Sequence, residues 1–374
     1  MDAVVEKSKG EFFGMNMSVA KKIIDTGGGA DELMAYIVLA RGVSKQNKSR
    51  ISTHGAQSIS KRTGMTYTKA EKAINSLCAS EVISKPITKI DKATPDNRKT
   101  KWVVNDAGTD TNINLWLANA IADGLGNDEI KSPLERIYTD TPLGSSSRIT
   151  EARLDTMMVL LTLYQHHELE AYGGVNPKIG LYREWKASEN VVDREKTNIP
   201  DTNASLYEIA GSHEQVFIKF AEEALFYIEN TTDRHNRFWS AFNNIKALGL
   251  VYEVTQIWSS NPSIDIKAEP LYTLYIHSES ARKSEPYLQT EIHKTAFRFG
   301  VMDRYSEFAN MEDNEDYSDI KSGRFRYIGH SIHGGYPIGI YRLKYRAKTS
   351  DTGKGIEAER MRVGHWEKIL MNLY

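Results

Sequence analysis

The sequence predicts a mostly α-helical protein with small β-hairpins, an α+β fold class, on the strength of three observations. Several segments place apolar residues at the i, i+3, i+4 and i+7 positions that form one face of a helix. Two of these segments are followed by a pair of strand-like runs separated by a polar turn. The composition, 40% hydrophobic and 26% charged over 374 residues, is that of a chain that buries more than one core.

The first predicted domain follows a short leading segment. Residues 1–29, which include three consecutive glycines, are expected to form a flexible N-terminal arm. A first amphipathic helix is expected over residues 30–44. Its apolar positions are Leu33, Tyr36, Ile37 and Ala40.

Two further helices and a hairpin are expected after it. A short helix over residues 56–63 should stop at Gly64, and a longer one should begin at Thr68 as its N-cap. The apolar face of the longer helix consists of Ala70, Ala73, Ile74 and Leu77. Two strands, over residues 82–90 and 101–105, then complete the first domain at residue 105.

Positive charge is concentrated in this part of the chain. From Arg41 to Lys101 there are 14 Lys and Arg against 4 Asp and Glu, a local net charge of +10. The whole chain carries −1, so the remainder carries −11. Such a basic segment is the electrostatic footprint of a phosphate-binding surface. The alternative interpretation is a lysine-rich, well-solvated face.

The order helix, helix, tight turn, helix and two-stranded wing over residues 30–105 resembles the winged helix-turn-helix superfamily. This resemblance implies a recognition helix that enters the major groove of DNA with its N-terminal end near the base edges. The DNA-binding residues it implies on and before that helix are Lys61, Arg62, Thr66, Tyr67, Thr68, Lys69, Lys72 and Asn75. On the wing they are Arg98, Lys99 and Lys101.

A second copy of the pattern is predicted over residues 150–280. A helix from Thr150, a middle helix over 213–228 and an insertion near 170–204 would precede a helix whose Phe238, Ala241, Phe242 and Ile245 repeat the same spacing. Strands over 251–258 and 271–276 would form its wing. The implied DNA-binding residues are Arg234, His235, Arg237, Asn243 and Lys246, although this more apolar module could instead bind a protein partner.

The remaining segments are interpreted as a linker and a tail. Residues 106–149 are expected to form a connecting helix and a linker, and residues 281–374 a C-terminal α+β region. In that tail, alternation predicts a β-ribbon with apolar and basic faces. Its apolar face would hold Tyr341, Leu343 and Tyr345, and its basic face Arg342, Lys344 and Arg346.

Several classes of protein are disfavoured by the sequence. A single cysteine, Cys78, excludes a disulfide framework or a cysteine-rich zinc module. The motifs of phosphate loops, dinucleotide sites, nucleophile elbows and zinc peptidases do not occur. We therefore expect no enzyme activity, cofactor or metal, and a cytoplasmic, nucleoid-associated protein without a membrane span or signal peptide.

Taken together, these patterns predict two winged helix-turn-helix modules with small β-wings plus a C-terminal α+β region. This arrangement is similar to tandem two-winged-helix DNA-binding proteins, and a sequence-specific transcriptional regulator is the first interpretation. One alternative is a plasmid or phage replication initiator that binds origin repeats; a second is a winged-helix adaptor for protein contacts. The implied partners are double-stranded DNA and either a second copy in a homodimer or the replication or transcription machinery.

Overall fold

The computed structural model describes residues 12–43, 50–85, 101–105, 115–124, 131–185, 204–209, 212–216, 218–262, 264–276, 325–330, 336–346 and single positions between 354 and 361. The chain folds into two compact units with mixed helix and antiparallel sheet, so the expected α+β class is confirmed. The first unit comprises Met1–Gln165, Ala221–Leu250 and Tyr345–Thr349; the second comprises His166–Phe220, Val251–Lys344 and Ser350–Tyr374.

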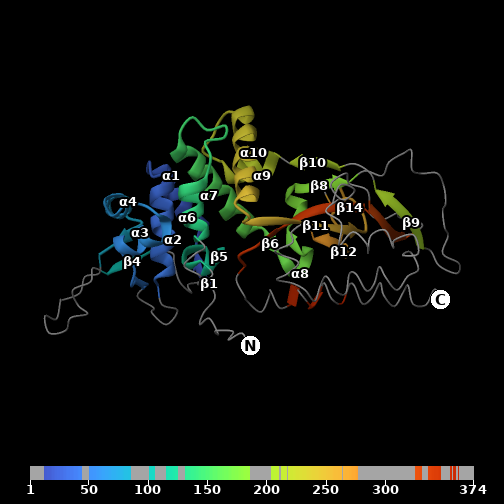
Figure 1. Cartoon of the computed structure of the whole chain (residues 1–374), viewed down its shortest axis with the longest axis horizontal. Helices are drawn as coiled ribbons and strands as arrows, with labels where there is room; N and C mark the ends of the chain where they lie inside the picture. The colour runs from blue at the N-terminus through green and yellow to red at the C-terminus, as the bar shows by residue number, and fades with distance from the viewer. Residues whose placement is uncertain are drawn as a thin grey trace. The chain divides into compact units, whose positions relative to one another are not determined.

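The first unit is largely helical (Figure 1). Its helices are α1 (Met17–Asp25), α2 (Ala30–Arg41), α3 (Ala56–Thr63), α4 (Tyr67–Ala79), α5 (Ala120–Asp123), α6 (Pro133–Asp140), α7 (Ile149–Gln165) and α10 (Thr231–Ala247). The chain passes from the second unit back into the first within α9 (Ile218–Ala224). Its strands are β1 (Phe12–Met15), β2 (Ile51–Ser52), β3 (Ile83–Ser84), β4 (Trp102–Val104) and β5 (Leu115–Ala118).

Helix α2 is the centre of this unit. The four predicted apolar positions are buried, but so are Met34, Ala35, Val38 and Leu39 on the remaining sides. The helix packs against α3 and α4 on one side and against α7 and β1 on others. The prediction of an amphipathic helix was therefore right about its existence and wrong about its exposure, because elements distant in sequence cover its second face.

The expected flexible arm is wrong for residues 12–29. Strand β1 pairs antiparallel with β5, and α1 begins at Met17 with Asn16 as its N-cap. Phe13 and Met15 are buried, as are the inward residues of α1. Burial of the apolar residues in this segment offsets the loss of conformational entropy on ordering. Residues 1–11 lie outside the described part of the chain.

A small sheet accompanies α3 and α4. Its strand order is β2-β4-β3, with Ile51 opposite Val103 and Ile83 opposite Val104. The two strands predicted around the basic turn are thus present near its base, and β2 is a third strand that the sequence analysis did not predict. The turn itself, residues 86–100, lies outside the described residues.

Where the structure describes residues 106–149, the expected connecting helix and linker are replaced by a strand, the short helix α5 and helix α6. Residues expected to lie in a connecting helix form β5, whose Trp116 packs edge-on against Phe12 at 5.4 Å between ring centroids. The proline-containing stretch begins helix α6, with Ser132 as N-cap and Pro133 in the first turn. Proline suits that position because its missing N–H has no partner there in any case.

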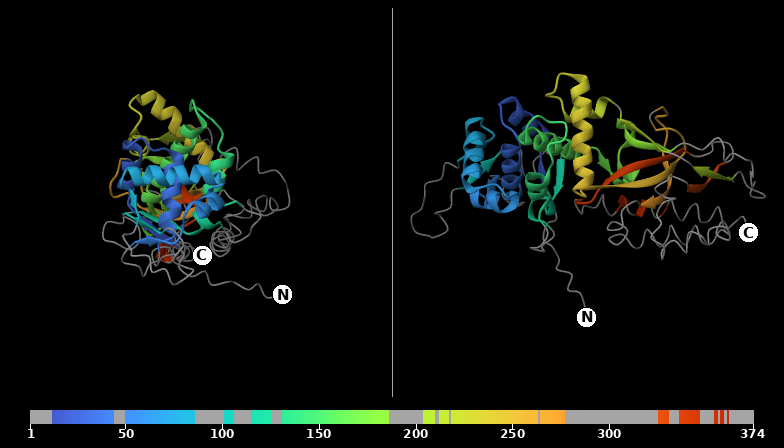
Figure 2. Two further views of the ribbon diagram at one scale, coloured as in Figure 1. Left: turned by 90° about the vertical axis from the view of Figure 1, so that its left-hand side faces the viewer. Right: turned by 45° about the horizontal axis from the view of Figure 1, so that its top comes forward.

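The second unit is built on an antiparallel sheet. Its elements are β6 (His167–Glu168), α8 (Leu169–Tyr172), β7 (Gly174–Val175), the 3-10 helix η2 (Pro177–Ile179), β8 (Leu181–Trp185), β9 (Ala204–Ile209), β10 (Ser212–Val216), β11 (Val251–Trp258), β12 (Pro270–Ile276), β13 (Phe325–His330) and β14 (Tyr336–Leu343). Five strands share one sheet in the order β10-β8-β14-β11-β12, and β9 pairs with β13 separately. Figure 2 shows β11 and β14 running alongside each other.

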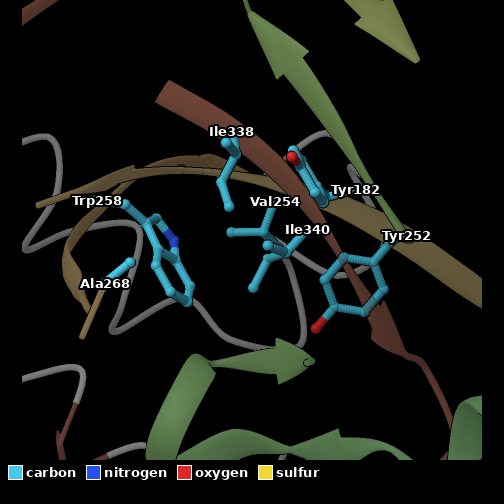
Figure 3. Close-up of a cluster of buried hydrophobic side chains, with 7 residues drawn as sticks. All are labelled: Tyr182, Tyr252, Val254, Trp258, Ala268, Ile338 and Ile340. Carbon is cyan, nitrogen blue, oxygen red and sulfur yellow. The ribbon is translucent and has the colours of Figure 1, made fainter. Parts of the chain in front are cut away.

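One face of this sheet holds an apolar core (Figure 3). Val254 and Ile340 lie between Trp258 and Tyr252 at its centre, and Trp258 is fully buried. Tyr172 of α8 stacks on Trp258 with 5.9 Å between ring centroids. This core depends on strands distant in sequence, since the paired residues Val254 and Ile340 are 86 positions apart, and local periodicity therefore cannot predict it.

The predicted second module over 150–280 does not form one compact unit. Helices α7 and α10 belong to the first unit, whereas the expected wing strands β11 and β12 belong to the sheet of the second. The insertion near 170–204 supplies β8 to that same sheet, and the expected helix over 213–228 is instead β10 followed by the shorter α9. Strand β11 pairs with β14 on one side and with β12 on the other, so it is an interior strand.

The C-terminal basic ribbon is also corrected. β14 lies between β8 and β11, and Arg342 is 1% exposed, with its Nε donating to the carbonyl of Gly173. The apolar residues Tyr341, Leu343 and Tyr345 are buried as predicted. Within the described ranges, none of the helices has the length and apolar character that crossing a membrane requires.

Candidate nucleic-acid interface

The turn between α3 and α4 determines where α4 begins. Gly64 ends α3 with φ +72°, the left-handed region that glycine adopts without strain. Thr66, not Thr68, is the N-cap of α4, because its hydroxyl accepts the backbone N–H of Lys69 at 3.3 Å. The helix therefore starts two residues earlier than the capping-box pattern predicts.

Helix α4 has a buried and an outward face. The predicted set Ala70, Ala73, Ile74 and Leu77 is buried, which confirms that assignment. Thr68, Lys72 and Asn75 are exposed and spaced by four and three residues, so they form one row on the side away from the core. Of the predicted residues on this helix, these three present their polar groups outward and have no hydrogen-bond or ion-pair partner among the described residues.

Tyr67 lies on one flank of that row. Its side chain is 52% exposed, the largest exposure of an aromatic ring among the described residues. A hydrogen bond from its hydroxyl to the Glu71 carboxylate, together with the charge of that carboxylate, raises the pKa of Tyr67. The single hydrogen of the Tyr67 hydroxyl is thus donated to Glu71, so what Tyr67 offers on this flank is an exposed ring and a hydroxyl oxygen that can accept.

Lys69 lies on the opposite flank and is held by neighbours. Its Nζ donates to the hydroxyl of Tyr138 on α6 at 3.2 Å and lies 3.8 Å from the carboxylate of Asp31 on α2. The hydrogen bond to Tyr138, and then the charge of Asp31, raise the pKa of Lys69. Lys69 is thus charged but partly neutralised, unlike Lys72.

The other predicted residues near α3 differ in availability. Arg62 donates from Nε to Asp123 at 2.8 Å, and the same carboxylate binds Arg41 at 2.6 Å, so Arg62 joins α3 to α2 and α5. Lys61 on the same helix is exposed. The guanidinium of Arg62 has a structural role that the sequence analysis did not predict.

The predicted wing is described only at its base. Lys101 is exposed there, and Lys85 of the opposite strand lies over the Trp102 ring at 5.7 Å. Both ammonium groups lie next to β3 and β4 rather than on α4. Arg98 and Lys99 lie outside the described residues, so their assignment as wing contacts stays a prediction.

The basic residues predicted on α10 are partly used inside the unit. Arg237 makes two 2.8 Å hydrogen bonds to the carboxylate of Asp155, which is 1% exposed on α7. Tyr227 donates to the same carboxylate at 2.7 Å and Ser146 at 3.0 Å. The guanidinium of Arg237 is therefore committed to a buried carboxylate inside the unit, and its assignment as a DNA contact stays a prediction.

Arg234 is likewise engaged by its own unit, and its assignment as a DNA contact also stays a prediction. Its Nε donates to the carbonyl of Ile228 at 2.8 Å, and its side chain is 15% exposed. His235 and Asn243 are exposed, although His235 accepts a hydrogen bond from Trp239 at 3.1 Å. Lys246 lies over the Phe242 ring at 5.2 Å. The predicted α10 set is thus divided between interior contacts and scattered exposed positions.

The residues missed by the sequence analysis are the partners of these cations. Asp31, Asp123, Tyr138 and Asp155 each hold a predicted DNA-binding residue or its neighbour. Each lies on a different helix from its partner, at a separation of 38 to 82 residues, so no spacing rule could have found them.

Comparison of the chain with protein-family models, with curated proteins and with solved structures finds no match. Among the described residues, no group of three or more His, Cys, Asp or Glu side chains is arranged to hold a metal ion.

Proposed function

We propose that residues 30–105 form a winged helix-turn-helix module that binds double-stranded DNA with α4 in the major groove. The observation that carries this proposal is the outward row of Thr68, Lys72 and Asn75 on a helix whose other face is buried. Lysine and asparagine side chains donate to base edges or phosphates, and an asparagine amide matches the N6 and N7 groups of adenine.

The arrangement around α4 supports the same proposal. The elements α2, β2, α3, α4, β3 and β4 follow one another in that order, and the sheet order β2-β4-β3 brings the two ends of the basic turn together. This is the order that a winged helix requires. The local net charge of +10 between Arg41 and Lys101 would draw the module towards phosphates.

Sequence-specific binding of this kind is what a transcriptional regulator requires, and regulation of transcription is the role we propose. Sites selected from a random duplex library would test the role further. A single or inverted site is expected for a regulator, whereas an array of direct repeats would favour an origin-binding replication initiator instead.

The experiment that tests DNA binding is a salt series on random duplex DNA with the full chain. Lys72→Ala should weaken binding and lower the slope of log affinity against log salt by about 1, since one phosphate-neutralising charge is lost. Lys267→Ala, an exposed lysine of the second unit, is the matched control and should change neither. No binding at low salt would overturn the proposal in favour of a protein-interaction module.

A further inference from the structure

Lys69 differs from the outward row because its ammonium is held at a fixed place beside α4. Tyr138 accepts one of its hydrogens at 3.2 Å. The 3.8 Å distance to Asp31 is an ion pair but too long for a hydrogen bond. An ammonium group has three donors, and the Lys69 side chain is 48% exposed. The group is thus anchored on one side and open to solvent on the other.

The Tyr138 side chain, which holds Lys69, is itself fixed by its neighbours. Tyr138 is 8% exposed, and the guanidinium of Arg153 on α7 lies over its ring at 4.1 Å. Helix α6 is fixed to α3 in turn, because Ser132 donates to the carbonyl of Arg62 at 2.7 Å. Three helices therefore determine where the Tyr138 hydroxyl lies, and with it the Lys69 ammonium.

From this geometry we infer that Tyr138 is a positioning residue for DNA binding, and that it presents Lys69 to a phosphate flanking the groove that α4 enters. The inference rests on the proposed function. A free lysine loses side-chain rotamers when it binds a phosphate, whereas a lysine already held by Tyr138 has lost most of them beforehand. Asp31 opposes this contact, since its carboxylate repels the same phosphate.

A double-mutant cycle with Tyr138→Phe and Lys69→Ala tests the inference in the full chain. Phenylalanine keeps the ring under Arg153 and removes only the hydroxyl. Tyr138→Phe should weaken binding to duplex DNA by about three- to tenfold, the cost of immobilising one long side chain. In the Lys69→Ala background the same substitution should change nothing. Equal effects in both backgrounds, or none in either, would overturn the inference.

Two further variants keep the result unambiguous. Asp31→Asn should tighten binding at low salt, because Tyr138 still holds Lys69 while the opposing charge is gone; weaker binding would contradict the placement of Lys69 beside DNA. Lys72→Ala in the same assay separates the two proposals. If it weakens binding while Tyr138→Phe does not, only the role of Tyr138 fails. If neither matters, the assignment of α4 as the DNA-binding helix fails with it.

Discussion

Helices α4 and α10 carry the same apolar spacing and comparable basic residues, yet their neighbours give them different roles. Among the described residues, no acidic side chain pairs with the outward row of α4, and Lys69 on its flank stays half exposed. On α10 the central arginine turns inward to a buried carboxylate on α7. The comparison teaches that a basic residue on a helix indicates a binding surface only when no buried acid lies opposite it.

The largest effect on stability is expected from removing the buried ion pair between Arg237 and Asp155. Arg237→Ala leaves the Asp155 carboxylate buried without its cation and should lower the free energy of unfolding by about 3 to 5 kcal/mol. Urea denaturation measures this. Asn243→Ala, on the exposed side of the same helix, is the control and should change stability by less than about 0.5 kcal/mol. Equal losses for both variants would show that the Asp155 pair is not what fixes α10.

A second test compares the N-cap residues of α4 and α10, and its expected effect on stability is smaller. Thr66→Ala on α4 and Asn230→Ala on α10 should each cost about 1 kcal/mol, because each side chain satisfies a backbone N–H of the first turn. Thr68→Ala should cost far less, since the structure places Thr68 inside the helix. Thermal unfolding of the three variants decides between the two N-cap assignments, and a larger loss at Thr68 would restore the sequence-based one.

The smallest expected effect concerns alkaline pH. Burial, and then the adjacent charge of Asp155, raise the pKa of Tyr227 well above its ordinary value. The unfolded chain therefore releases this proton first, near pH 10, so stability present below that pH is lost as pH rises through the raised pKa. Urea unfolding at pH 9 and pH 10.5 should show a loss that is smaller in Tyr227→Phe. A loss of stability of the same size in the wild type and in Tyr227→Phe would show that other tyrosines cause it.

The sequence predicted those elements that depend on neighbouring residues alone. The start of α2, the extent of α3, the end of α3 at Gly64 and the buried positions of α4 all follow from helical periodicity and from glycine's conformational freedom. These features are local, so one segment contains all the information that determines them.

The features that were missed depend on residues far apart in the chain. Strand β1 requires β5, and the inward turn of Arg237 requires Asp155, 82 residues earlier. Strands β11 and β14 pair with each other, although the sequence analysis assigned the first to a wing and the second to the C-terminal tail. Periodicity predicts which face of a helix is apolar. It cannot predict which distant side chain pairs with a charged residue at the border of that face.

The pairing of β1 with β5 has a consequence for how the protein is made. Phe12 lies opposite Ala118, so the ribosome must release residue 118 before β1 finds its partner, several seconds later at about 5 to 20 residues per second. Until then the strand edge and the buried faces of Phe13 and Met15 are open to other chains. A fragment that stops at residue 105 lacks β5 and would leave the edge of β1 unpaired. A fragment that includes residues 12–118 contains both strands and would allow them to pair.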